Sequence, residues 1–86
     1  MKKWKPTEQE ISDTQNWGMW GKEASKFPWY YDEMETCYIL EGAAFVTDAK
    51  GDKLAFEKGD MVQFEQGLSC TWEITSAIKK KYKFGM

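Results

Sequence analysis

One carboxylate set among apolar residues is the first feature of this sequence that could do chemistry. Glu35 begins the run 35–40, whose odd positions share one face of a predicted strand, so Glu35 lies beside Cys37 and Ile39. A carboxylate placed next to core residues must be hydrogen-bonded, paired or protonated. Two interpretations follow: tyrosine, tryptophan and backbone donors satisfy Glu35 structurally, or Glu35 faces a ligand.

The two cysteines differ in what their surroundings predict. In the run 70–74, Cys70, Trp72 and Ile74 alternate with polar residues, which is typical of a half-buried strand and turns Cys70 inward. Cys37 is read as a small buried hydrophobic residue, because free cysteines are among the most buried residue types. Cys70 remains open between a buried residue and a binding or reactive one. Two cysteines do not make a disulfide framework, so both are expected to be reduced.

The basic residues narrow the chemistry further. Histidine is absent and all 12 basic residues are lysines, which excludes His-based catalysis, His-ligated metals and arginine clamps for phosphate. Seven lysines lie within residues 2–5 and 79–83, which leaves an acidic body that argues against nucleic-acid binding. The run 79–81 is predicted to be a solvated strand edge, where charges discourage edge-to-edge pairing. With no 18-residue apolar stretch and no signal peptide, we expect a cytoplasmic protein that does not enter a membrane.

The elements that must position these residues are short strands. The 86 residues suffice for one small domain, and Thr7 with Glu10 has the spacing of a capping box for a helical turn to about residue 13. Gly42, Gly59 and Gly67 mark predicted turns, and residues 48–51 a hairpin loop. The predicted strands are 27–31, 36–40, 43–47, 54–57, 61–64, 70–74 and 78–84. This pattern predicts an all-β sandwich or barrel of antiparallel strands.

Two stretches of the sequence resemble the motifs of the cupin family. Residues 35–42 look like the end of the first cupin motif, and residues 59–64 followed by Gly67 look like the second. The resemblance covers about residues 17–84 and is most specific to small single-domain cupins (RmlC-like jelly rolls) grouped with the cupin domain of (S)-ureidoglycine aminohydrolase. It implies a cupin-type double-stranded β-helix, or jelly-roll barrel, over residues 17–86, preceded by an N-terminal extension over residues 1–16.

The sequence departs from the cupin pattern at the metal ligands. The histidine pair of the first motif falls on Trp29 and Tyr31, and the histidine and proline of the second fall on Cys70 and Glu65. Of the usual ligands only Glu35 matches in kind, so no metal and no other cofactor is expected. A site formed by Glu35, Tyr31 and Cys70 is the alternative, since thiolate and carboxylate bind zinc.

Three function classes remain open. The favoured one is a metal-independent cupin that binds a small molecule in a cavity lined by Trp29, Tyr31, Glu35, Cys70 and Trp72. The second is an enzyme related to ureidoglycine aminohydrolase, acting on a small polar nitrogen compound, with Glu35 and Cys70 as catalytic candidates. The third is a structural barrel filled by its aromatic residues. The cupin resemblance further implies that Glu35 and Cys70 share one polar locus, with Cys70 accessible to small reagents and Cys37 hidden.

Aromatic residues near the N-terminus suggest an interface. Trp17, Trp20 and Phe27 are predicted to cover the barrel or a subunit interface, because the chain carries more large aromatic residues than a domain of this size can bury. The expected partners are therefore a small-molecule ligand and a second copy of the chain, as a homodimer.

Overall fold

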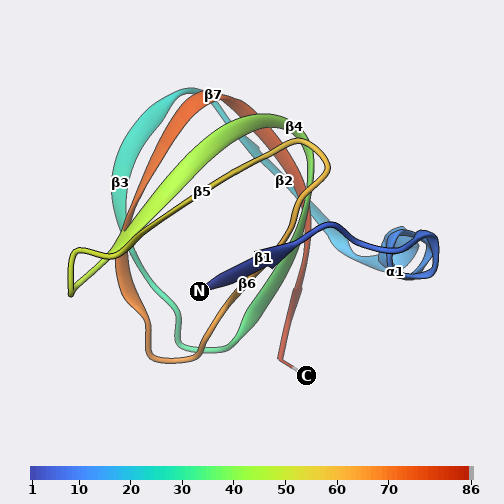
Figure 1. Cartoon of the computed structure of the whole chain (residues 1–86), viewed down its shortest axis with the longest axis horizontal. Coiled ribbons are helices and arrows are strands. Elements are labelled where there is room, and N and C mark those ends of the chain that lie inside the picture. Colours follow the sequence, from blue (N-terminus) through green and yellow to red (C-terminus); the bar gives the residue numbers. More distant parts are fainter. Residues whose placement is uncertain (86) are drawn as a thin grey trace.

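The computed structural model describes residues 1–85 and consists mainly of antiparallel strands around one core (Figure 1). A short helix and a 3₁₀ turn precede most of the strands. The elements are β1 (Lys2–Trp4), α1 (Glu8–Asp13), η1 (Thr14–Asn16), β2 (Gly18–Lys22), β3 (Ser25–Tyr30), β4 (Glu35–Asp48), β5 (Lys53–Glu57), β6 (Met61–Phe64) and β7 (Ser69–Phe84). The expected all-β fold is confirmed.

Two long strands organise the fold. The first half of β4 pairs with β6 and with the second half of β7, whereas the second half of β4 pairs with β5 and with the first half of β7. The first half of β7 also pairs with β3, and its second half with β2. The strand order is β1-β6-β4-β7-β2, with β3 added on β7 and β5 on β4. The sheet thus curves around the core without closing, as in a jelly roll.

The bend in β4 depends on Gly42. Irregular register between β4 and β7 is confined to residues 39–44. Gly42 has a φ of 85°, and a Cβ atom there would collide with the carbonyl oxygen of Ala77. The sequence predicted a turn at Gly42 between two separate strands, but β4 continues through it, because the chain bulges and bends at Gly42 instead of reversing. The sequence also predicted two strands where β7 runs unbroken.

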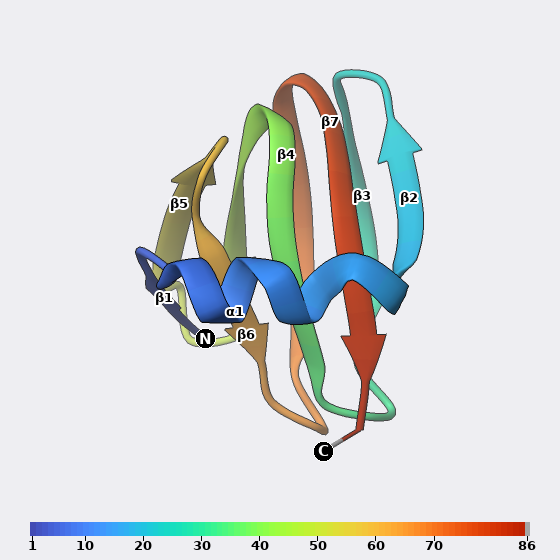
Figure 2. The ribbon, with the colours of Figure 1, turned by 90° about the vertical axis from the view of Figure 1, so that its right-hand side faces the viewer.

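The N-terminal segment belongs partly to the sheet. The capping box is confirmed, since the Thr7 side chain accepts from the Glu10 backbone N–H and the Glu10 carboxylate accepts from the Thr7 N–H. Helix α1 lies outside the strands, across the face seen in Figure 2. Strand β1 pairs with β6, so residues 2–4 are part of the sheet. No helix in residues 1–85 is long and apolar enough to cross a membrane.

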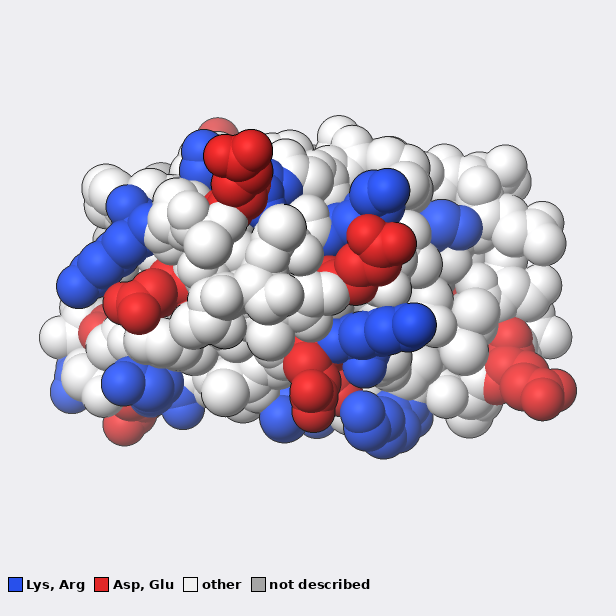
Figure 3. Space-filling view, turned by 90° about the horizontal axis from the view of Figure 1, so that it is seen from above, with Lys and Arg blue, Asp and Glu red and all other residues white. Residues whose placement is uncertain are grey.

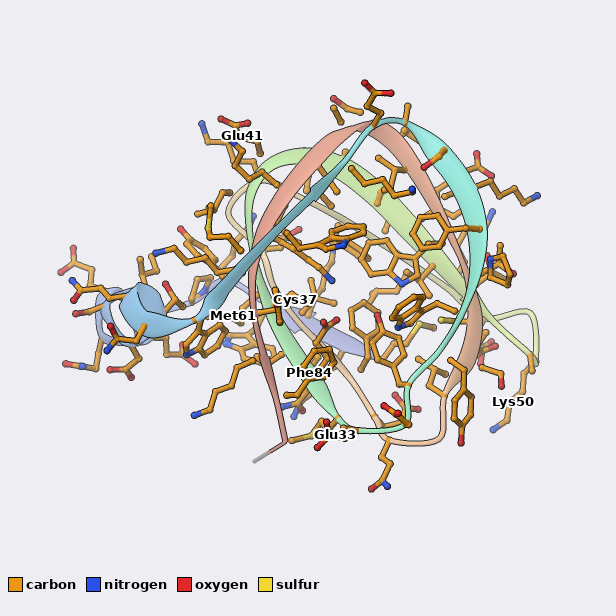
Figure 4. All side chains as sticks on the ribbon, turned by 180° about the vertical axis from the view of Figure 1, so that it is seen from behind. Glu33, Cys37, Glu41, Lys50, Met61 and Phe84 are labelled. Atoms are coloured by element: carbon orange, nitrogen blue, oxygen red, sulfur yellow. The ribbon has the colours of Figure 1, made fainter. Side chains whose placement is uncertain are left out.

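The core is aromatic at its centre. Trp72 is 2% exposed, and its ring packs against Phe56 and Phe64 and stacks on Phe27. On the surface seen in Figure 3, lysines and acidic residues are interspersed. Side chains such as Glu41 and Lys50 point away from the strands, whereas Cys37 points inward (Figure 4).

Candidate functional site

An aromatic cavity of about 190 Å³ opens at the side of the sheet formed by β2, β3 and β7. Four buried side chains form its floor, three further aromatic residues its sides, and two exposed aromatic residues its mouth. The floor consists of Tyr31, Glu35, Trp72 and Lys80, the sides of Trp20, Phe27 and Tyr82, and the mouth of Trp29 and Phe84, which are 50% and 43% exposed. The cavity therefore leads from solvent to a charged floor through aromatic walls.

The floor carries a buried ion pair. The Lys80 ammonium donates to Oε1 of Glu35 at 3.1 Å, and the two residues are only 5% and 4% exposed. Cys37 completes the cluster: its thiol donates to the same oxygen at 3.1 Å, and its sulfur accepts from Lys80 at 3.4 Å. Burial raises the pKa of the Cys37 thiol well above its ordinary value, so Cys37 stays a neutral donor.

Two tryptophans enclose the ammonium of Lys80. Its Nζ lies 4.9 Å from the ring centroid of Trp20 and 4.7 Å from that of Trp72. Cation–π attraction of this kind is strengthened when the cation is removed from water. Glu35 thus has a full counter-charge, and the interpretation that tyrosine, tryptophan and backbone donors satisfy it is wrong because it missed Lys80.

The prediction of a solvated edge at residues 79–81 is also wrong. This part of β7 lies between β4 and β2 rather than at an edge. Alternation along the strand buries Ile78 and Lys80 and exposes Lys79. In the run 70–74 the even positions point inward. Continuing this alternation to residues 78 and 80 would have predicted that the side chain of Lys80 is buried.

Tyr31 joins the polar floor to the aromatic core. Its ring stacks on Phe64 at 4.8 Å between centroids, and its hydroxyl oxygen accepts from Nε1 of Trp72 at 3.1 Å. Burial, with a further contribution from the charge of Glu35, raises the pKa of Tyr31 far above its ordinary value. The phenol therefore keeps its proton and is available as a donor toward the cavity.

Cys70 lies away from this cluster. Its thiol donates to the carbonyl oxygen of Trp29 at 3.4 Å, and it is in register with Asp48 near the opposite end of β7 from Lys80. Burial, with smaller contributions from Asp48 and Glu65, raises the pKa of Cys70 to about 11. Cys70 is absent from the cavity lining.

The structure thus brings together four of the five residues predicted to line a cavity. Trp29, Tyr31, Glu35 and Trp72 line one space, whereas Cys70 does not. Cys37 lies beside Glu35, as alternation along the strand predicts, but Cys70 does not, so the expectation of a shared Glu35 and Cys70 locus is wrong. The reason is strand register, which places Cys70 opposite Trp29 of β3 rather than toward the first half of β4.

Sequence reasoning missed part of the lining. Trp20 and Phe27 were expected to cover the barrel or an interface, but both contribute to the cavity walls. Tyr82 and Phe84, on the second half of β7, were not predicted as site residues. Both residues follow Lys80 at every second position of the strand, and this alternation indicates that they share its face.

The side chains at the cavity do not fit the metal that cupins commonly hold. An indole stands at Trp29, the Tyr31 phenol keeps its proton, and an ammonium already lies 3.1 Å from the carboxylate of Glu35 and would repel a cation. Within residues 1–85, no three cysteine, aspartate or glutamate side chains cluster closely enough to hold a metal ion. The alternative site of Glu35, Tyr31 and Cys70 is therefore not assembled.

The curved antiparallel sheet and the cavity within it define a cupin. The sequence matches the EutQ-like cupin domain family over residues 9–82, and the chain belongs to that family. A DUF861 family protein from Thermotoga maritima is similar at 45% identity and a TM-score of 0.93, with 96% of this chain and 97% of that chain covered.

More distant similarities concern the fold alone. A putative ethanolamine utilization protein Q from Salmonella typhimurium shares 22% identity at a TM-score of 0.73, and the EutQ protein of Clostridium difficile 18% at 0.73. Each alignment covers 79% of this chain but only 55% and 53% of those proteins, so the chain spans about half their length. Comparison with proteins of curated function finds no match.

Proposed function

We propose that this protein is a small-molecule-binding cupin whose cavity acts without a metal ion. The observation that carries the proposal is the combination of aromatic walls with a polar floor built on Glu35 and Lys80. Ligand pockets are typically apolar, with a few polar groups that fix orientation. The sequence resemblance of residues 26–72 to the cupin domain of (S)-ureidoglycine aminohydrolase supports a relationship to that group.

The competing enzymatic hypothesis has less support. It needs Glu35 as an acid or base together with Cys70 as a nucleophile or ligand, and the two do not face the same cavity. A raised thiol pKa also makes Cys70 a poor nucleophile near neutral pH. Binding is therefore the function that the geometry favours.

A thermal-shift screen of small molecules on chelator-dialysed, untagged protein tests this function. A ligand that binds only the folded state raises the melting temperature by mass action. Trp29→Ala, at the mouth, should reduce the shift, whereas Tyr30→Ala, at a neighbouring exposed position outside the lining, should not. Elemental analysis should find far less than one equivalent of metal. Stoichiometric metal that is lost in Glu35→Gln would contradict the metal-free proposal.

We also propose that the protein is a homodimer formed through its N-terminal segment. Ile11 and Met19 are exposed apolar side chains on this segment, and such residues support an interface. Sedimentation should show a dimer at tens of micromolar, and a strict monomer there would contradict the proposal.

A further inference from the structure

The charges at the cavity floor cancel. Among the described residues that line the cavity, Glu35 and Lys80 are the two charged ones, and they are paired at 3.1 Å. A ligand with a net charge would bring a third charge into this space without a counter-charge, which is costly away from water. The floor therefore favours a ligand that is neutral overall.

Glu35 retains one oxygen for a ligand. Its Oε1 accepts from both Lys80 and Cys37, whereas Oε2 accepts no hydrogen bond from residues 1–85. Within the same residues, no buried polar side-chain atom lacks a partner. Oε2 is therefore not buried but reaches the cavity, where a carboxylate oxygen acts as an acceptor. A ligand that satisfies it must carry a hydrogen-bond donor.

Tyr31 offers the complementary group. Its oxygen accepts from the indole of Trp72, and its own hydrogen has no acceptor within residues 1–85. A hydroxyl on the ligand satisfies both positions, since it donates to Glu35 and accepts from Tyr31.

The size and walls of the cavity set the rest of the ligand. An apolar cavity of about 150 Å³ takes a benzene ring, so about 190 Å³ accommodates one six-membered ring with a small substituent. The rings of Trp20 and Trp72 meet edge to face at 6.3 Å, an arrangement that a further aromatic ring can extend.

We propose that the cavity binds a neutral compound of one aromatic or heteroaromatic ring that bears a hydroxyl or N–H donor, directed at Oε2 of Glu35. This inference rests on the proposed function, since it names the ligand class of the same cavity. It assigns selectivity to Glu35 and Tyr31, and affinity to the aromatic walls.

Calorimetric titration with four probes at pH 7 tests the ligand class. Phenol is neutral at this pH and should bind most tightly, and benzene, which lacks the donor, at least tenfold more weakly, because Oε2 is then desolvated without a partner. Benzoate and benzylammonium should also bind at least tenfold more weakly. Equal or tighter binding of either ion or of benzene would overturn the proposal.

A matched pair of variants tests the role of Tyr31. Tyr31→Phe keeps the ring and removes the hydroxyl, and should reduce the preference for phenol over benzene about tenfold. Tyr30→Phe makes the same change at an exposed neighbouring position outside the lining and should leave it unchanged. An unchanged preference in folded Tyr31→Phe would overturn the assignment. If the ring compounds do not bind, but other molecules in the thermal-shift screen bind in a way that depends on Trp29, the proposed ligand class is wrong and the proposed function stands. If no molecule binds, the proposed function itself is wrong.

Discussion

Replacing Lys80 by methionine removes one partner of the buried ion pair and keeps most of the side-chain volume. The carboxylate of Glu35 then has the Cys37 thiol as its remaining donor and is left without a counter-ion. Because Glu35 and Lys80 are only 4% and 5% exposed, the pair counts as buried, and removing one partner should lower the free energy of unfolding by about 3–5 kcal/mol.

Urea denaturation of wild type and variant at pH 7 measures this loss in the free energy of unfolding.

Lys79→Met is the matched control on the same strand. Lys79 approaches Glu41 at 4.0 Å, with both side chains more than half exposed, and exposed pairs contribute about 0–1 kcal/mol. The double variant Glu35→Leu with Lys80→Met should recover much of the stability, because it leaves no unpaired charge. The reasoning is refuted if Lys80→Met costs no more than Lys79→Met.

Three further predictions concern the backbone and the thiols. Gly42→Ala should cost more than about 3 kcal/mol, because its Cβ meets backbone that cannot move away, whereas Gly51→Ala, at a similar φ in open space, should cost about 1–2 kcal/mol; equal costs in urea denaturation would contradict the bulge argument. Because folded Cys37 keeps its proton, its contribution to stability is complete below about pH 8.5 and falls above it, so wild type should lose about 2 kcal/mol more than Cys37→Ala between pH 7 and pH 10; parallel curves would contradict it. Native Cys70 should alkylate at least tenfold more slowly at pH 8 than an ordinary thiol, and Glu35→Gln should not change that rate, because Asp48 and Glu65 are the carboxylates that affect it; peptide mapping that finds Cys37 labelled first would contradict the assigned burial.

The fold could be predicted because its signals are local. Alternation and turn residues located parts of β3 to β7, and the spacing of Thr7 and Glu10 located α1. Strands β1 and β2 were missed, since Lys2–Trp4 and Gly18–Lys22 carry little apolar alternation and are held by pairing with distant strands. Such pairing is a tertiary effect that a local pattern does not contain.

The site could be predicted only in part for a related reason. Glu35 was found because a carboxylate on an apolar face stands out, but its partner Lys80 lies 45 residues away and looks like a surface lysine in a charged run. The position of Cys37 beside Glu35 follows from alternation along one strand, whereas the position of Cys70 relative to Glu35 depends on register across β4 and β7. A bulge at Gly42 alters that register.

A ¹⁵N NMR titration of chelator-dialysed protein with phenol tests the central claim most directly, because the five tryptophan indoles report on two separate surfaces. Trp20, Trp29 and Trp72 line the cavity, whereas Trp4 and Trp17 line a different depression beside α1. A metal-independent ligand cavity predicts saturable shifts of the first three indole signals, with the other two unchanged. Shifts confined to Trp4 and Trp17, or cavity shifts that occur only after a metal ion is added, would contradict it.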